Sequence, residues 1–480
     1  MAQGWALSTP ITNHRAVSSE LNAIPEKLES RMAGFHAEIT GHVVGPIDVE
    51  HFNEFLPVAQ STGTGPDGMS AYQKLASELN TAKNEGGMYE ALVEYLNELR
   101  PSENIRFCDK HHKVLRVFDG VDIKPDIMVF HGNDEATIEA MFEVKYNDDD
   151  DPFDDNLPSF QRESINSKKT LGQITSYATC HQALEFRTHA FSALIFRKYM
   201  RLLRWDRSGV VVTKKILLND RSLFDFFRRF TSATPVQRGR DPTVTAYLSG
   251  QMEDIRRLLE CDKKAPLLAI SIGNNEYIVL KDQPPGSTSP IGRSTRCFKA
   301  YDSQKKQVVL LKDSWRVVSP TLKPEHKIYA RLHEKKVQNV PEVYHGSDIG
   351  DENDPHHTTQ TKLWFDKTKT FDKTFDKTAK SFKLTFRTHR HYRIVLEYLP
   401  YSLEDFEITP EMIAIVRDAS LAHCDAAIEA RVVHRDISNG NIMFKRKEDG
   451  TVQGYLIDWD LSLDLDLADQ NSVEAQPERT

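Results

Sequence analysis

The chain of 480 residues carries 70 acidic and 62 basic residues, so its net charge is -8, and 39% of its residues are hydrophobic. This length exceeds one ordinary hydrophobic core and predicts two to three domains. The acidic balance argues against a globally basic nucleic-acid-binding protein, although it is compatible with a local basic groove. No apolar run approaches the roughly 18 residues of a membrane helix, and the first residues lack the pattern of a secretory signal.

Five cysteines are spread along the chain without a CxxC or Cys/His zinc spacing: Cys108, Cys180, Cys261, Cys297 and Cys424. An odd, dispersed set of this kind indicates reduced thiols in an intracellular protein rather than a disulfide framework. The sequence does not distinguish cytoplasm from nucleus, and it does not indicate an oligomeric state.

The N-terminal half of the sequence predicts one folded α/β layer, which is flanked on both sides by less regular segments. Residues 1–70 are rich in turn formers and predict a partly disordered arm, with a short helix near 18–32. Residues 71–231 predict a helix, three strands, a second helix and two further strands around a turn at Ser208, which is an α/β layer with its own core. Residues 232–287 predict a helical linker region, in which strand-like runs begin again near residue 266.

Two strand-like runs of this layer, "PDIMVF" and "MFEVKY", hold a group of charged residues. Asp126 opens the first run, and Glu143 and Lys145 lie at i and i+2 of the second, on one face. With the element order, these residues resemble the PD-(D/E)XK nuclease-like fold. That resemblance implies that the carboxylates hold Mg²⁺ and that the lysine steadies the attacking water or the scissile phosphate. Gln173 and Glu90, on the flanking helices, would complete such a site.

The same residues fit a structural role equally well, because a buried Glu–Lys pair can satisfy itself. The acidic run at 148–155 lies close by in sequence and would repel a DNA backbone. A nucleic-acid partner is therefore possible but not favoured, and the pattern favours an inactive, regulatory or docking module over a nuclease.

The C-terminal part contains the strongest chemical signal, "HRDISNGNI" followed by "YLIDWD". Asp436 and Asn441 lie in a loop after a predicted helix at 411–430, and Asp458 follows an apolar strand-like run. Phosphoryl transfer needs a carboxylate that receives the substrate proton and further oxygen ligands for Mg²⁺. Asp436 fits the first role, and Asn441 and Asp458 fit the second.

These motifs resemble the HRDxxxxN and DFG motifs of eukaryotic-like protein kinases. More narrowly, the sequence of these motifs resembles that of the fungal-type protein kinase family, and the resemblance covers roughly residues 75–480. We therefore expect an α+β chain with a nuclease-like α/β domain and then a bilobal kinase domain at 288–480. Its N-lobe would cover 288–399, and a partial C-lobe would cover 400–480. The resemblance implies ATP and Mg²⁺ as cofactors and a protein substrate, with Ser or Thr as the favoured acceptor.

Upstream residues occur at the spacings that this resemblance implies. Lys312 ends a β-branched run, where such kinases keep the lysine that grips the α- and β-phosphates, and Glu325 on the next predicted helix would be its ion-pair partner. Gly292 corresponds to the middle glycine of the glycine-rich loop. Glu397 and Leu399 lie where an apolar strand enters the hinge, so they would offer backbone hydrogen bonds to adenine.

Two positions depart from the family pattern. Ser438 stands where serine/threonine kinases usually carry a lysine that meets the γ-phosphate, and Asp460 replaces the DFG glycine, which adds a carboxylate and removes a flexible hinge. The motifs are also similar to those of aminoglycoside and choline phosphotransferases. A small-molecule kinase, a pseudokinase scaffold and a metal-dependent nuclease working through the N-terminal domain therefore remain alternatives.

Two further segments carry expectations. The segment 365–380 contains FDKT three times, which is too little for a solenoid and predicts a surface insertion within 348–390. Only a short tail follows Asp460, whereas a kinase C-lobe continues through an activation segment and several helices. We therefore expect a truncated C-lobe that lacks on the order of 100 residues, with impaired substrate transfer. The helix at 411–430 would then expose an apolar face made of Met412, Ile415, Val416 and Ala419.

Overall fold

The computed structural model describes residues 28–57, 68–100, 104–118, 121–132, 135, 137–184, 186–248, 252–281, 289–351, 354–371 and 386–470. The start of the predicted arm, most of the FDKT repeats and the last ten residues lie outside these ranges. In the described part of the chain, no helix combines the length and the apolar character needed to cross a membrane.

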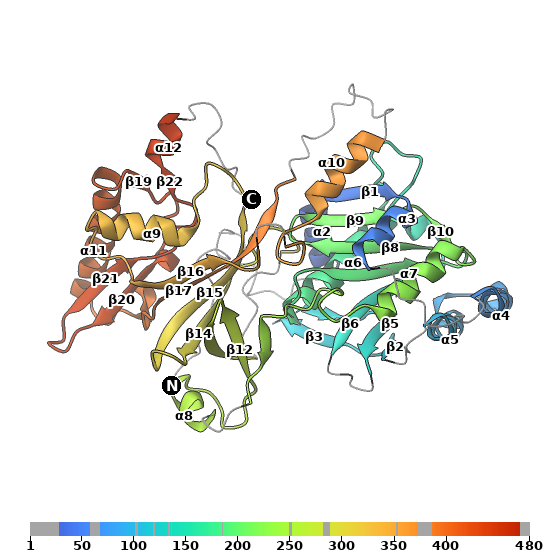
Figure 1. Ribbon diagram of the computed structural model, residues 1–480, viewed down its shortest axis with the longest axis horizontal. Helices are drawn as coiled ribbons and strands as arrows, with labels where there is room; N and C mark the ends of the chain where they lie inside the picture. The colour runs from blue at the N-terminus through green and yellow to red at the C-terminus, as the bar shows by residue number, and fades with distance from the viewer. Residues whose placement is uncertain are drawn as a thin grey trace.

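The N-terminal layer is built on an eight-stranded mixed sheet (Figure 1). In chain order its strands are β1 (Val43–Ile47), β2 (Ile105–Asp109), β5 (Ile127–His131), β6 (Ile138–Val144), β7 (Ala190–Ile195), β8 (Tyr199–Asp206), β9 (Gly209–Thr213) and β10 (Ile216–Leu217). The spatial order is β1-β9-β8-β7-β6-β5-β2, with β10 paired to β8. Strands β6 to β9 are buried along their whole length, as expected for apolar strands that are covered on both faces.

Helices cover both faces of this sheet. They are α2 (Leu28–Ile39), α3 (Val49–Phe52), α4 (Gly68–Thr81), α5 (Tyr89–Leu99), α6 (Ile165–Leu184) and α7 (Arg221–Ser232). Helix α6 connects β6 to the parallel strand β7, which is the crossover that such a pair requires. It packs closely on α2, because a Cβ atom at Gly172 would lie only 2.1 Å from the carbonyl oxygen of Met32. A small ladder of β3 (Leu115–Phe118) and β4 (Val121–Ile123) completes the layer.

The predicted arm at 1–70 is wrong for its described part. Strand β1 pairs with β9, and Ile39 and Phe52 are fully buried in the cores on the two faces of the sheet. The physical reason is that the run "VVGPI" forms an edge strand whose partner lies more than 150 residues away. The turn-rich residues around this run gave no indication of that pairing. Helix α2 also begins later than the expected helix near 18–32, of which residues 18–27 lie outside the described residues.

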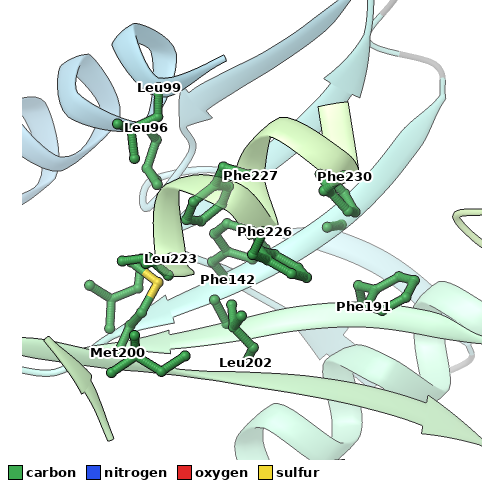
Figure 2. Close-up of a cluster of buried hydrophobic side chains, with 14 of the residues drawn as sticks. Leu96, Leu99, Phe142, Phe191, Met200, Leu202, Leu223, Phe226, Phe227 and Phe230 are labelled. Atoms are coloured by element: carbon green, nitrogen blue, oxygen red, sulfur yellow. The ribbon is translucent and has the colours of Figure 1, made fainter. Parts of the chain in front are cut away.

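The core of this layer centres on helix α7. In the run "SLFDFFRRF" four of the five apolar residues fall at i, i+3, i+4 and i+7, so they form one helical face. Figure 2 shows Leu223, Phe226, Phe227 and Phe230 directed from α7 towards the sheet. The Phe227 ring lies 6.5 Å from that of Phe142 on β6, and all four α7 side chains are at most 2% exposed.

A second sheet of seven strands follows. Its strands are β11 (Val244–Ala246), β12 (Leu267–Ile272), β13 (Asn275–Leu280), β14 (Arg296–Asp302), β15 (Gln307–Val317), β16 (Val343–Asp348) and β17 (His389–Glu397). The spatial order is β11-β12-β13-β14-β15-β17-β16. Helix α8 (Met252–Leu258) and helix α9 (Glu325–Glu334) accompany it.

The segment 232–287 is therefore not a helical linker. Three of its strands belong to the second sheet, and among its described residues between β11 and β12 only α8 is helical. The two apolar runs around Gly273 form a hairpin, because this glycine adopts a positive φ of 57° in the turn between β12 and β13. The sheet extends across the predicted boundary at residue 288.

The insertion within 348–390 carries helix α10 (Thr361–Phe371), which packs on β1 of the first sheet (Figure 1). Trp364 and Phe386 are 4% and 6% exposed and belong to the core beneath α7. The Asp206 carboxylate, at the end of β8, accepts hydrogen bonds from the backbone N–H groups of Gln360 and Thr361 at 2.7 and 3.0 Å. The first FDKT repeat is therefore part of a docked helix rather than a free surface insertion.

The C-terminal part contains helix α11 and short strands. Its elements are β18 (Tyr401–Ser402), α11 (Thr409–Ile428), β19 (Val432–Val433), β20 (Ile442–Arg446), β21 (Val452–Leu456), β22 (Leu463–Asp464) and α12 (Leu465–Gln470). The expected apolar face of α11 is wrong in part, because Ile415 and Ala419 are buried where the helix packs on β21. Val416 is exposed as expected, and the other exposed apolar side chains of α11 are Ile413, Leu421 and Ile428.

Candidate active site

The structure brings Lys312 and Glu325 together. Lys312 lies on β15, between Cys297 of β14 and Ile394 of β17, and Glu325 is the first residue of α9. The Lys312 Nζ atom donates to the Glu325 Oε2 atom at 2.9 Å. The residues are 4% and 3% exposed, so the pair is shielded from solvent.

Two further carboxylates surround the same ammonium group. Asp458 follows β21 with a left-handed φ of 65°, and its backbone N–H donates to the Tyr329 hydroxyl at 3.3 Å. The Lys312 Nζ atom lies 2.5 Å from the Oδ1 atom of Asp458 and 3.4 Å from the Oδ2 atom of Asp460. The Asp460 carboxylate also accepts from the Arg293 Nη1 atom at 2.6 Å.

Burial dominates the titration of this cluster. It raises the pKa of Asp458 to about 8, and the neighbouring charge of Asp460 adds to the effect. Burial also raises the pKa of Glu325 despite its contact with Lys312. At Asp460 burial acts in the same direction, but Arg293 and Lys312 outweigh it and hold the pKa of that carboxyl well below its usual range. The cluster therefore has more carboxylates than cations, and an added cation would stabilise it.

Asp436 and Asn441 lie in the loop between β19 and β20, and the backbone oxygen of Asn441 accepts at 3.0 Å from the N–H of Ile457, the residue before Asp458. The Asn441 Nδ2 atom donates to the backbone oxygen of Asp436 at 2.6 Å and to its Oδ2 atom at 3.3 Å. His434 is fully buried, bonds through its Nε2 atom to the Ile457 oxygen at 2.8 Å and packs edge-on against Trp459. Burial lowers the pKa of His434, so this histidine anchors the loop as a neutral ring.

Several oxygens at this site have the properties of cation ligands. Four buried side-chain oxygens of this site take part in no hydrogen bond with the described residues: Glu325 Oε1, Asn441 Oδ1, Asp458 Oδ2 and Asp460 Oδ1. Ligand oxygens of the three carboxylates lie within 4.8 Å of one another. Hard cations such as Mg²⁺ take oxygen ligands of this kind, so the residues present fit the expected ion. The sequence indicated Asp460 only as a departure from the DFG pattern and not as a residue of this site. Its acidic side chain is the signal from which its place here could have been predicted.

The expected nucleotide-contacting residues lie on three separate segments. Gly292 lies in the segment between β13 and β14 with a φ of 83°, and its N–H donates to the Arg207 oxygen at 2.8 Å. Leu399 is buried at the end of the hinge. Glu397 ends β17, where its carboxylate pairs with Lys445 and its N–H donates to the Glu342 oxygen. Its N–H is therefore committed within the protein.

The N-terminal group is also assembled. The Lys145 Nζ atom lies 2.5 Å from the Oε1 atom of Glu143. The two oxygens of Asp126 accept from the Tyr89 hydroxyl at 2.9 Å and from the Val144 N–H at 2.8 Å. Glu143 is 2% exposed, and burial raises its pKa to about 8. Its Oε2 atom makes no hydrogen bond within the described residues.

The accessory residues expected there are placed differently. Glu90 is exposed, and it is Tyr89 that reaches Asp126 because the helix turns its neighbour inward. The Gln173 Nε2 atom donates to the Tyr177 hydroxyl at 2.8 Å. The acidic run at 148–155 is not simply a solvated loop, because Asp151 forms a fully buried ion pair with Arg201 at 2.9 Å.

Comparison with known proteins bears on most of the chain. A family model described as fungal protein kinase matches residues 128–480. Among solved structures, the crystal structure of the BubR1 kinase domain matches with 13% sequence identity and a TM-score of 0.25. That match covers 42% of this chain and 51% of the BubR1 chain, so the chain spans about half the length of that relative. The curated proteins contain no match.

Proposed function

Because the chain belongs to the fungal protein kinase family, we propose that it transfers the γ-phosphoryl group of ATP to a serine or threonine hydroxyl of a protein, in a reaction that depends on Mg²⁺. The observation that carries this proposal is the Lys312 ammonium, which is held 2.9 Å from Glu325 and 2.5 Å from Asp458, beside buried oxygens that make no hydrogen bond with the described residues. A lysine fixed in this way is the group that phosphoryl-transfer sites of this class direct at phosphate oxygens.

The roles follow from the chemistry of each side chain. Lys312 holds the α- and β-phosphates, and Glu325 keeps the ammonium in place from α9. Asp436 receives the proton of the substrate hydroxyl. Asn441 and Asp458 would hold the Mg²⁺ ion, which when bound neutralises charge on the phosphate oxygens. The adenine base would lie against the hinge, at the Glu397 carbonyl and the Leu399 backbone.

The Lys312–Asp458 contact is one that a bound nucleotide would replace. Three carboxylates share one ammonium there, and each contact satisfies a charge that would otherwise be buried alone. Phosphate oxygens of a nucleotide offer the ammonium equivalent partners, so Lys312 can exchange its contact with Asp458 without leaving a buried charge uncompensated. The carboxylate that it releases is then available to a cation.

The test is label transfer from γ-labelled ATP to a mixture of acceptor proteins, with Mg²⁺ or with a chelator. The proposal expects Mg²⁺-dependent labelling of serine or threonine by the wild-type chain and none by Asp436→Asn. Asp449→Asn, at an exposed turn between β20 and β21, is the matched control. Labelling of small alcohols or amino sugars alone would favour a small-molecule kinase, and nucleotide binding without any transfer would favour a pseudokinase scaffold.

We propose metal-dependent cleavage of nucleic acid at Asp126, Glu143 and Lys145 as the second candidate function. Its support is the assembled group, in which one oxygen of the buried Glu143 carboxylate accepts no hydrogen bond from the described residues. A metal ion beside such an oxygen would lower the cost of burying it. Divalent-metal-dependent cleavage that disappears in Glu143→Gln but persists in Asp436→Asn would support this function. If both variants fold and no metal binding is found, the group is a purely structural ion pair.

A further inference from the structure

Arg293 reaches the active site from the segment that precedes β14. Its Nη1 atom donates to the Oδ2 atom of Asp460 at 2.6 Å, and its side chain is 18% exposed. The same Asp460 oxygen lies 3.4 Å from the Lys312 Nζ atom. The guanidinium and the ammonium therefore lie beside one another, on a shared carboxylate.

The backbone around Arg293 is fixed from two sides. The N–H of Gly292 donates to the Arg207 oxygen in the turn between β8 and β9, at 2.8 Å, and the N–H of Trp315 on β15 donates to the Arg293 oxygen at 2.7 Å. A guanidinium carried on an anchored backbone loses less conformational freedom when it binds a ligand. Arg293 is thus positioned in advance rather than carried on a free flap.

The surroundings of Arg293 are strongly anionic. Burial alone would lower the pKa of Arg293, but Asp460 and Asp458, with a smaller effect of Glu325, raise it. The guanidinium therefore stays charged in a site where three carboxylates outnumber the two cations Arg293 and Lys312. Guanidinium groups bind carboxylate and phosphate through the same fork of N–H donors, so the Asp460 carboxylate occupies a position that a phosphate oxygen could take.

The catalytic loop offers no cation of its own at the position after Ile437. Ser438 is half-buried there, and its hydroxyl carries no charge. A site for phosphoryl transfer nevertheless needs positive charge at the transferred group. Arg293 is a second cation beside Lys312, and it comes from the glycine-loop side of the cleft rather than from the catalytic loop.

We propose that Arg293 is a phosphate-binding residue that exchanges its bond to Asp460 for one to the γ-phosphate of ATP, and so supplies the charge that Ser438 lacks. Asp460 is then the positioning residue that holds the guanidinium when no nucleotide is bound. This assignment rests on the proposed function, because it needs ATP in the cleft. It predicts discrimination between ATP and ADP, which differ only in the group that Arg293 contacts.

The test measures the dissociation constants of ATP and ADP by calorimetry for wild type, Arg293→Gln and Arg293→Lys. Loss of a charge-assisted contact should weaken ATP binding by about tenfold or more in Arg293→Gln, with ADP binding unchanged. Arg293→Lys should retain part of the preference for ATP. Retained ADP binding also shows that the variant is folded. Arg116→Gln, whose side chain is 84% exposed on β3, is the control and should bind both nucleotides as wild type does.

A second variant tests the link to the catalytic loop. Ser438→Lys introduced into Arg293→Gln should restore the preference for ATP, because it returns a cation to the γ-phosphate from the other side of the cleft. Equal weakening of ATP and ADP in Arg293→Gln, unchanged ATP binding, or failure of Ser438→Lys to restore the preference would each overturn the assignment while the proposed function stands. Absence of binding of both nucleotides in the wild type would instead overturn the proposed function and, with it, this assignment.

Discussion

The Lys312 ammonium and the Asp458 carboxylate lie 2.5 Å apart, although one belongs to β15 and the other follows β21, 146 residues later in the chain. Both residues are at most 5% exposed. Burying two charges is costly, and their attraction offsets that cost only when the remaining donors and acceptors are satisfied. Here the second oxygen of Asp458 is not satisfied by the described residues, which makes the cluster sensitive to pH and to added cations.

The pH dependence of stability should show this sensitivity. Burial raises the folded-state pKa of Asp458 from its ordinary value to about 8. A carboxyl with a raised folded pKa contributes stability that is fully present below the unfolded pKa and is lost as pH rises through the folded pKa. Without divalent cations, the free energy of unfolding of the wild type should therefore fall, relative to that of Asp458→Asn, between about pH 4 and about pH 8.

Urea denaturation of both proteins at several pH values checks this prediction. Added Mg²⁺ should restore wild-type stability at pH 9 and leave Asp458→Asn unchanged, because the ion favours the ionised carboxylate. Parallel pH profiles of the two proteins would contradict the account.

The core beneath α7 should be intolerant of truncation. The Phe227 side chain is fully buried, and its ring lies 5.8 Å from that of Phe107 and 5.3 Å from that of Phe226. Phe227→Ala removes this packing and leaves a cavity, which typically costs about 3–5 kcal/mol. Denaturant unfolding should show a free energy of unfolding that is lower by about that amount. Phe406→Ala, at a side chain that is 38% exposed, should lower it little. A loss below about 1 kcal/mol for Phe227→Ala would contradict the described packing.

The attachment of α10 to the first sheet should depend on Asp206. This carboxylate is 2% exposed and accepts from the N–H groups of Gln360 and Thr361, from the Thr361 hydroxyl and from Ser208. Asp206→Ala leaves buried donors unpaired, which costs about 1–3 kcal/mol for each such group. The measurement is thermal unfolding together with protease sensitivity of α10, and Asp254→Ala, at a side chain that is 75% exposed, is the control. Equal stability of the two variants would show that Asp206 does not hold α10.

The outer face of α11 should promote self-association. Ile413, Leu421 and Ile428 are 61%, 48% and 72% exposed, and exposed apolar stripes of this kind make proteins associate. Replacing the three by Gln should lower the apparent mass measured by light scattering at high protein concentration. The control is Ile165→Gln, at a single isoleucine of α6 that is 86% exposed. No change in apparent mass after the triple substitution would mean that this face does not drive association.

Local patterns in the sequence identified several of the residues that the structure brings together at the candidate site. Spacing alone located Asp436, Asn441 and Asp458 within their motif. It also located Lys312, which ends a β-branched run. Each of these residues lies at a fixed point of one element. The pair of Glu143 and Lys145 was predictable for the same reason, since both lie on one strand face. The roles of these residues remain predictions, whereas their proximity is a property of the fold.

Contacts between distant elements were not predictable in this way. Strand β1 pairs with β9 and α10 packs on β1, and in each case the partner lies far along the chain. The bond between Arg293 and Asp460 is another such contact, because it joins residues 167 positions apart. Periodicity shows which face of an element is apolar, but it does not show which other element covers that face. For the same reason, the strands at 244–280 appeared as a linker although they extend the second sheet.

Nucleotide-induced stabilisation tests the central claim, that Lys312 and Asp458 form the site for Mg²⁺ and ATP, most directly. A ligand at 100 times its dissociation constant adds about 2.7 kcal/mol of stability, and the account predicts that thermal unfolding with Mg²⁺ and ATP shows this gain for the wild type and for Lys263→Met, a variant at an exposed lysine. Lys312→Met and Asp458→Asn should each lose it. An undiminished gain in both of these variants would contradict the assignment of the site.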